Sequence, residues 1–186
     1  MKKLIASLWG LLVIISLTAQ TTTDVKTLNR TEKKEIQAQE RAARKERMLQ
    51  MINDRRFVIE AYSLEDRYGQ LIQVTPTTNF VAVDSLQATI QLALPNRIGG
   101  QNGLGGITED GYLHSLKFAE KAPKHGISFE MEITGPAFGS SHVFVDLNDD
   151  GLATVRFSGA FGARFQMRGG FKSLDNSMVF KGMARY

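Results

Sequence analysis

The most informative stretch of the chain is residues 78–118, which read TNFVAVDSLQATIQLALPNRIGGQNGLGGITEDGYLHSLKF. Residues 87–94 alternate between apolar and more polar positions, and one face carries Ala88, Ile90, Leu92 and Leu94. A period of two over this length predicts a half-buried antiparallel strand. Residues 79–83 and 112–118 predict a strand on either side of it, and a glycine-rich loop follows the central one. The stretch therefore predicts neighbouring strands of one antiparallel sheet.

The same alternation recurs before and after this stretch. Further strands are predicted at residues 57–62, 70–74, 127–134, 141–147, 153–157, 163–167 and 178–180, with turn residues between them. About ten short strands without an intervening helix predict an all-β antiparallel meander, closed as a barrel or, alternatively, folded as a sandwich. We expect its interior to hold Ile90, Leu92, Phe129, Met131, Val143, Val145, Val155 and Phe165.

Residues 1–19 have the pattern of a secretory signal peptide. Lys2 and Lys3 precede an apolar run, and Ala19 offers a small residue for cleavage. The run is shorter than the ~20 residues of a spanning helix, so we expect cleavage, no transmembrane segment afterwards, and a periplasmic or secreted protein. The chain has no cysteine, which excludes a disulfide framework, a cysteine nucleophile and the lipid-bearing cysteine of a lipoprotein.

The mature chain is predicted to have three parts. Residues 20–30 form a disordered spacer, residues 31–55 a charged helix that begins with Thr31 as N-cap, and residues 56–186 the antiparallel β domain. Apolar positions in the helix are sparse, so we expect it to dock only near Met48, Leu49, Ile52 and Phe57. The basic cluster within residues 41–47 could contact membrane headgroups, but the glutamates beside it favour a solvated face.

The overall charge indicates no nucleic-acid partner. Loss of Lys2 and Lys3 with the signal peptide lowers the formal net charge from +4 to +2. Sequence-independent nucleic-acid binding depends on clustered Lys and Arg, which this balance does not supply.

Several runs resemble a known family. They include Phe57-Val58-Ile59-Glu60-Ala61, Ala88-Thr89-Ile90-Gln91-Leu92, Asn102 to Thr108, and Ser177 to Gly182. Together they resemble the secreted Bacteroidota family catalogued as domain of unknown function 4251. The resemblance implies an exported, mostly β protein, and it brings no established activity, cofactor or catalytic residue.

The glycine-rich loop and the strand after it supply the candidate ligand-binding residues, which are Gly103, Gly105, Gly106, Glu109, Tyr112 and His114. Glycines allow positive φ, and successive N–H groups can hold an anion. The spacing fits no phosphate-binding motif, because Thr108 stands where a third glycine is needed and no helix follows. A structural loop is therefore favoured. Alternation places His114 on one face with Tyr112, Leu116 and Phe118, which we expect to point inward.

Two further motifs are weak. Residues 146–151 match the first half of a calcium loop, but Phe157 stands where a bidentate glutamate is required, so we predict a tight hairpin and no metal. Ser141 and His142 are adjacent on a strand and should face opposite ways, which argues against their cooperation. We predict no cofactor and no catalytic residue.

The leading hypothesis is a non-catalytic binding module for a small apolar or amphipathic ligand, or a peptide, at one end of the barrel. The first alternative is a structural or scaffolding envelope protein that binds an envelope partner through its N-terminal helix. The second is a hydrolase of esterase or glycosidase type, for which no convergent catalytic set is evident.

Overall fold

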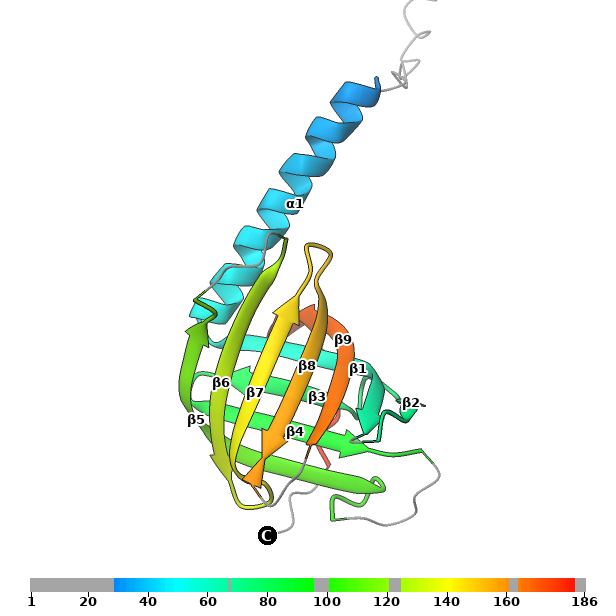
Figure 1. Ribbon diagram of the computed structural model, residues 1–186, viewed down its shortest axis with the longest axis vertical. Coiled ribbons are helices and arrows are strands. Elements are labelled where there is room, and N and C mark those ends of the chain that lie inside the picture. The colour runs from blue at the N-terminus through cyan, green and yellow to red at the C-terminus, as the bar shows by residue number, and fades with distance from the viewer. Residues whose placement is uncertain (1–28, 67, 96–100, 121–124, 161–163, 183–186) are drawn as a thin grey trace, which may run out of the picture. The chain divides into compact units, whose positions relative to one another are not determined.

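The computed structural model describes residues 29–66, 68–95, 101–120, 125–160 and 164–182. The predicted signal peptide and residues 20–28 of the predicted spacer lie outside these ranges. The elements, in chain order, are α1 (Arg30–Asn53), β1 (Arg56–Asp66), β2 (Leu71–Gln73), β3 (Phe80–Asp84), β4 (Gln87–Ala93), β5 (Gly106–Phe118), β6 (Ile127–Gly135), β7 (Gly139–Leu147), β8 (Leu152–Gly159), β9 (Arg164–Lys172) and a short 3-10 helix, Leu174–Asn176 (Figure 1).

The strands form a closed antiparallel barrel. The sheet order is β2-β1-β3-β4-β5-β6-β7-β8-β9, and β1 also pairs with β9. Eight strands therefore close on one another, and β2 is an extra strand that pairs with β1 through residues 63–65. Strand β1 pairs with β3 through residues 56–60 along one edge and with β9 through residues 58–66 along the other, with a register shift between Ala61 and Ser63. The predicted all-β barrel is confirmed, and the alternative, a sandwich, is not what forms.

One predicted strand is wrong. Residues 178–180 form no strand, although Met178 and Phe180 alternate with other residues. Their segment lies on the outside of the barrel, where the Phe180 N–H donates to the carbonyl of Thr77 at 2.7 Å. The side chains of Met178 and Phe180 are both largely exposed, so the alternating pattern does not mark a buried face here.

Apolar side chains from all around the barrel fill its interior. Six of the eight predicted core residues are buried, and Leu92 and Phe165 are partly buried against the same cluster. Aromatic rings pack at two levels. Phe57 contacts Phe129 edge-on, with ring centroids 5.7 Å apart, and stacks on Phe171. At the other end of the barrel, Phe157 stacks on Phe165 at 4.4 Å, and Phe138 packs against both.

The outer face of β4 departs from simple alternation. Gln91, expected on the polar face, is fully buried because the segment from Ser177 to Gly182 crosses it. Its Nε2 donates to the carbonyls of Thr78 and Phe180, and its Oε1 accepts from the Thr108 hydroxyl and the Gly182 N–H. All hydrogen-bonding positions of the carboxamide are therefore used.

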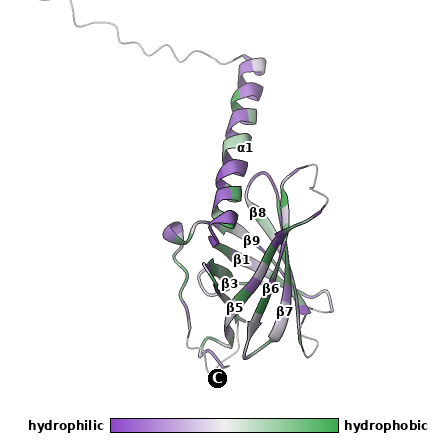
Figure 2. Cartoon of the chain, turned by 90° about the vertical axis from the view of Figure 1, so that its left-hand side faces the viewer, coloured by the Kyte–Doolittle hydropathy of each residue, from purple (hydrophilic) through white to green (hydrophobic). Residues whose placement is uncertain are grey.

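Helix α1 docks through its last turns. Met48 and Ile52 are buried in the barrel core, and Leu49 and Met51 are partly buried against it, which confirms the predicted docking region. Residues 36–43 are exposed, and hydrophilic residues dominate this part of α1 (Figure 2). The predicted N-cap is wrong: the helix begins at Arg30, and the Asn29 N–H donates to the Glu32 carboxylate. No helix in the described ranges has the length and apolar character needed to cross a membrane.

Candidate functional site

The glycine-rich loop is organised by Asn102, which the sequence reasoning missed. The Asn102 Nδ2 donates to the carbonyl of Leu92, while its Oδ1 accepts from the N–H groups of Leu104 and Gly106. Gly103 and Gly105 have φ angles of +74° and +81°, which residues with a side chain rarely adopt. Two of the loop amides are thus already bonded within the loop, as expected for a structural turn. The signal was an asparagine directly before a glycine.

Glu109 points into the barrel and is only 1% exposed. Its Oε2 accepts from the N–H groups of Ala137 and Phe138 at 2.6 and 3.0 Å, so the carboxylate caps the β6–β7 hairpin. Its Oε1 lies against Gly135 and has no hydrogen-bond partner among the described residues. Burial raises the pKa of Glu109, as does the neighbouring Asp110 charge, and the two N–H groups offset only part of this.

Tyr112 and His114 lie outside the barrel, contrary to expectation. Tyr112 is 63% exposed, Leu113 is the inward residue, and His114 is exposed. The register shifts between Leu113 and Ser115, so a strict alternation over β5 fails at this point. The six candidate residues therefore divide among a loop, the interior and the outer surface. Ligand binding by them stays a prediction.

Ser141 and His142 face opposite sides of β7, as predicted. Ser141 is buried, and its hydroxyl has no hydrogen-bond partner in the described part of the chain, whereas His142 is exposed. The pair cannot act as nucleophile and base for each other.

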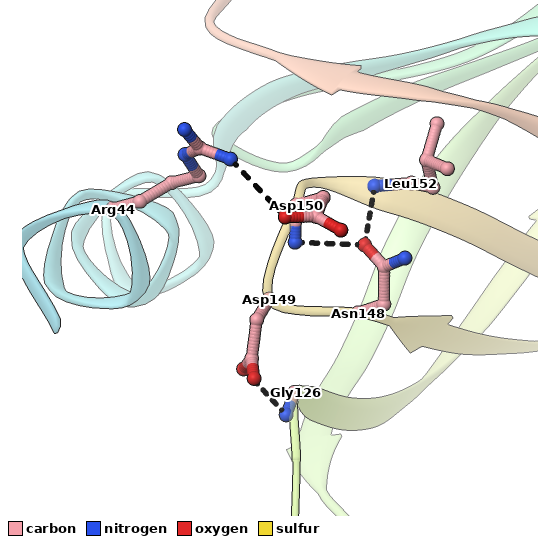
Figure 3. A network of polar contacts seen from close by, with 6 residues as sticks. All are labelled: Arg44, Gly126, Asn148, Asp149, Asp150 and Leu152. Carbon is pink, nitrogen blue, oxygen red and sulfur yellow. Dashed lines mark hydrogen bonds and ion pairs between the residues drawn. The ribbon is translucent and has the colours of Figure 1, made fainter. Parts of the chain in front are cut away.

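The acidic turn between β7 and β8 uses its side chains to hold the hairpin and its neighbours (Figure 3). The Asn148 Oδ1 accepts from the N–H groups of Asp150 and Leu152, and the Asp149 carboxylate accepts from the Gly126 N–H. The Asp150 Oδ1 lies 3.6 Å from the Arg44 Nη1 of α1. Among the residues that the structure describes, no group of three or more His, Asp or Glu is placed to hold a metal ion.

A hollow of about 540 Å³ lies where α1 meets this turn and the end of β9. We call it the α1–β9 groove; it is lined by Arg44, Arg47, Met48, Gln50, Met51, Asp150, Gly151, Phe171, Lys172, Ser173 and Asn176. Its apolar lining comes from the partly buried Met51 and from Met48 and Phe171, which are only 2% and 8% exposed. Arg44, Arg47 and Lys172 supply cationic groups. Chain segments more than a hundred residues apart in sequence thus form one amphipathic groove.

The cations of the groove differ in their surroundings. The Lys172 Nζ lies 2.6 Å from the Glu60 Oε2. Burial raises the pKa of Glu60, but hydrogen bonds from Lys172 and Ser177 and the charge of Lys172 outweigh this and leave the pKa below its ordinary value. Arg44 contacts Asp150 more loosely, and no ion pair of Arg47 is found within the described ranges.

The sequence carried a partial signal for this groove. Residues 44, 47, 48 and 51 have the i, i+3, i+4, i+7 spacing that places side chains on one helix face. The basic residues of α1 were instead interpreted as a solvated face, in preference to a face that contacts membrane headgroups. Nothing in the local pattern indicates that Phe171 and Lys172 lie opposite that face.

Comparison with known proteins now identifies the family. Residues 39–170 match the family described as Domain of unknown function (DUF4251). The chain belongs to the DUF4251 family. It is also similar to the crystal structure of a DUF4251 family protein from Bacteroides eggerthii DSM 20697, with 31% sequence identity and a TM-score of 0.59, over 74% of this chain and 94% of that chain. No curated protein matches the chain. The DUF4251 match spans the α1 and β7–β8 sides of the groove.

Proposed function

We propose that this DUF4251 protein is an exported, non-catalytic binding module that holds a small amphipathic molecule in the α1–β9 groove. The observation that carries the proposal is the composition of the groove, which combines an apolar floor with a cationic rim. Its volume falls in the range of roughly 300–1,000 Å³ that is usual for small-molecule sites. Methionines suit such a floor, because their flexible, polarizable side chains adapt to ligands of different shape.

The barrel interior is a poorer place for a ligand. Phenylalanine rings and aliphatic side chains occupy it at both ends, and the β6–β7 hairpin tip closes one end through Phe138. A ligand there would have to displace well-packed side chains, which costs stability. This favours a groove on the outside over the barrel mouth suggested by the sequence.

The polar groups of the groove support binding rather than catalysis. Arginine stays protonated at physiological pH and lacks an acceptor, so Arg44 and Arg47 can donate to an anion but cannot take up a proton. Lys172 is already paired with the Glu60 carboxylate at 2.6 Å. The groove thus presents fixed donors beside an apolar surface.

Binding of amphiphiles tests the proposal. The exported protein, labelled with ¹⁵N, is titrated with dodecyl maltoside and dodecanoate below their micellar concentrations. We expect saturable chemical-shift changes at Met48, Met51 and Phe171, and weaker binding in Met51→Ser. Leu71→Ser is the matched control, because Leu71 is an exposed apolar residue of β2 that does not line the groove. Changes scattered over the surface, or equal effects of both substitutions, would contradict a groove site.

Export is part of this proposal and has its own test. The pattern of residues 1–19 supports a cleaved signal peptide. Protein recovered from the cell envelope or medium should begin at or near Gln20 on N-terminal sequencing. Recovery of uncleaved chain in the cytoplasm alone would contradict export.

A second candidate function is a scaffold that acts through α1. It is favoured by the exposed helical surface at residues 36–43, which makes no contact with the barrel core. This exposed part of α1 gains no stability from packing, which supplies most of the stability of helices in proteins, so a partner would stabilise it. Its test is the truncation described in the Discussion.

A further inference from the structure

We propose that the ligand of the α1–β9 groove is an anionic amphiphile, an apolar chain with a carboxylate, sulfate or phosphate headgroup, and that Asp150 competes with this headgroup for Arg44. The inference rests on the proposed function of the groove and adds the chemistry of its ligand. It is carried by the charges that face the groove and by the geometry of the Arg44–Asp150 contact.

The charges facing the groove are unbalanced. Helix α1 contributes Arg44 and Arg47, strand β9 contributes Lys172, and the β7–β8 turn contributes Asp150. Lys172 is matched by Glu60, which is 9% exposed at its side chain and holds Lys172 at 2.6 Å. Asp150 is the one carboxylate among the described residues that line the groove, and it pairs with Arg44 and not with Arg47. A second anion would complete the pairing, and the groove offers it an apolar surface for its chain.

The Arg44–Asp150 contact is of the kind that another anion can replace. Its 3.6 Å separation is longer than the roughly 2.7–2.9 Å of a strong charge-assisted hydrogen bond. Both side chains are well exposed, at 43% and 69%, so water screens their attraction. Figure 3 shows Asp150 at the tip of the hairpin turn. The Asn148 side chain holds this turn by accepting hydrogen bonds from the backbone N–H groups of Asp150 and Leu152. Loss of the Arg44 contact would therefore leave the turn itself intact.

The helix spacing indicates how such a ligand would lie. Arg44 and Arg47 come before Met48 and Met51 along one face of α1, and the rise from residue 44 to residue 51 is roughly 10 Å. A headgroup at the arginines would direct its chain along Met48 and Met51 toward Phe171. Guanidinium groups suit this role because they bind carboxylates and phosphates in a bidentate manner.

The same chemistry has two sources, a free amphiphile or the lipid of a membrane surface, and the structure favours the free molecule. The groove is lined on one side by α1 and on another by Phe171 and the β7–β8 turn. A volume of about 540 Å³ between such elements suits a single small molecule, whereas a membrane surface would contact exposed residues outside the groove.

Isothermal titration with two dodecyl amphiphiles tests the inference. The exported protein is titrated with dodecanoate and with uncharged dodecyl maltoside, both as monomers. We expect dodecanoate to bind more tightly. Arg47→Gln should weaken dodecanoate binding roughly tenfold, as removal of a charge-assisted contact would, and leave the maltoside unchanged. Asp150→Asn should strengthen dodecanoate binding about two- to tenfold by removing the competitor.

Matched substitutions control for net charge. Arg41→Gln removes the same charge from α1, and Asp84→Asn removes a carboxylate from the β3–β4 turn, and neither residue lines the groove. Both should leave dodecanoate affinity within about twofold of wild type. If Arg41→Gln weakens dodecanoate binding as much as Arg47→Gln does, the preference for dodecanoate comes from net charge alone, and the inference is overturned.

The remaining outcomes separate the two proposals. Absence of saturable binding by either amphiphile would overturn the proposed function and the inference with it. Equal binding of both amphiphiles, unchanged by Arg47→Gln, would leave the binding module standing and overturn the anionic ligand. Weaker dodecanoate binding in Asp150→Asn would overturn the competitor role. Binding to vesicles of anionic phospholipid without binding of free dodecanoate would overturn the free molecule as ligand.

Discussion

Glu109 was predicted as a ligand-binding residue, and in the structure its carboxylate has a structural role. The sequence placed it near a candidate site, and the structure places its carboxylate inside the barrel, where it caps the β6–β7 hairpin. Its environment is apolar except for the two N–H groups, so the charged form is costly. Glu109 is therefore a structural residue with a titration that should be measurable.

The pKa of Glu109 predicts a pH dependence of stability. Because the folded-state pKa is raised above the ordinary value of 4.5, the folded protein favours the protonated acid. This contribution to the free energy of unfolding is fully present below that value and is lost as pH rises through the raised folded pKa. Urea unfolding of wild type and Glu109→Gln at a series of pH values checks this. As pH rises from 4.5 through the raised folded pKa, the free energy of unfolding should decline in wild type but not in the variant. Parallel curves for the two proteins would show that Glu109 does not titrate in this range.

Gly135 is predicted to be required by the same carboxylate. A Cβ at residue 135 would overlap Oε1 of Glu109 and crowd the carbonyl oxygen of Asp110. Gly135→Ala should therefore destabilise the protein by roughly 1–3 kcal/mol. The control is Gly170→Ala, because a Cβ there meets no atom within 4 Å. If the overlap with Glu109 is the cause, Gly135→Ala should lower the stability less in a Glu109→Ala background than in wild type. Thermal unfolding of the four proteins measures this. Equal costs at Gly135 and Gly170 would point to backbone preference instead.

At the scale of elements, α1 joins an exposed segment to a docked one. Residues 36–43 are exposed, whereas Met48 and Ile52 are in the core. A chain that begins at Arg44 should keep the melting temperature of the full protein. A chain that begins after Gln50 loses Met48, and we expect a cost of roughly 2–5 kcal/mol, as for a lost core side chain. Similar melting temperatures of the two truncations would contradict docking through Met48.

The same truncation decides between a binding module and a scaffold. If residues 36–43 bind another copy or an envelope partner, sedimentation of the full protein should show an assembly that disappears when the chain begins at Arg44. The groove residues from Arg44 to Met51 remain in that chain, so amphiphile binding should persist. Loss of amphiphile binding would mean that the exposed part of α1 takes part in the groove.

The C-terminal segment couples distant parts of the whole molecule. Residues 177–182 bind Gln91, Thr77 and Glu60 mainly through backbone and polar contacts, while Met178 and Phe180 remain 82% and 61% exposed. Ending the chain at Asn176 should therefore cost about 1–3 kcal/mol, since Gln91 loses its hydrogen bonds with Phe180 and Gly182. The double variant Met178→Ser, Phe180→Ser should cost less than about 0.5 kcal/mol. Chemical unfolding of both proteins checks this, and a reversed order would mean that the two apolar side chains anchor the segment.

The sequence by itself determined the β architecture and where the helix docks. Alternation along Gln87 to Leu94 and residues 127–147 identifies buried faces, because side chains of a strand point alternately to its two sides. It also identified Met48 and Ile52, since large apolar residues are rare elsewhere on α1. These properties depend on near neighbours in the chain, which periodicity reports.

Only the tertiary structure decided closure, the buried polar groups and the groove. Pairing of β1 with β9 joins residues about a hundred positions apart, and Gln91 is buried by a segment from the other end of the chain. The bulge beside His114 turned a predicted inward face outward. Arg47 and Phe171 line one groove because the helix and the barrel pack together. The local pattern contains no information on which distant surfaces will face each other.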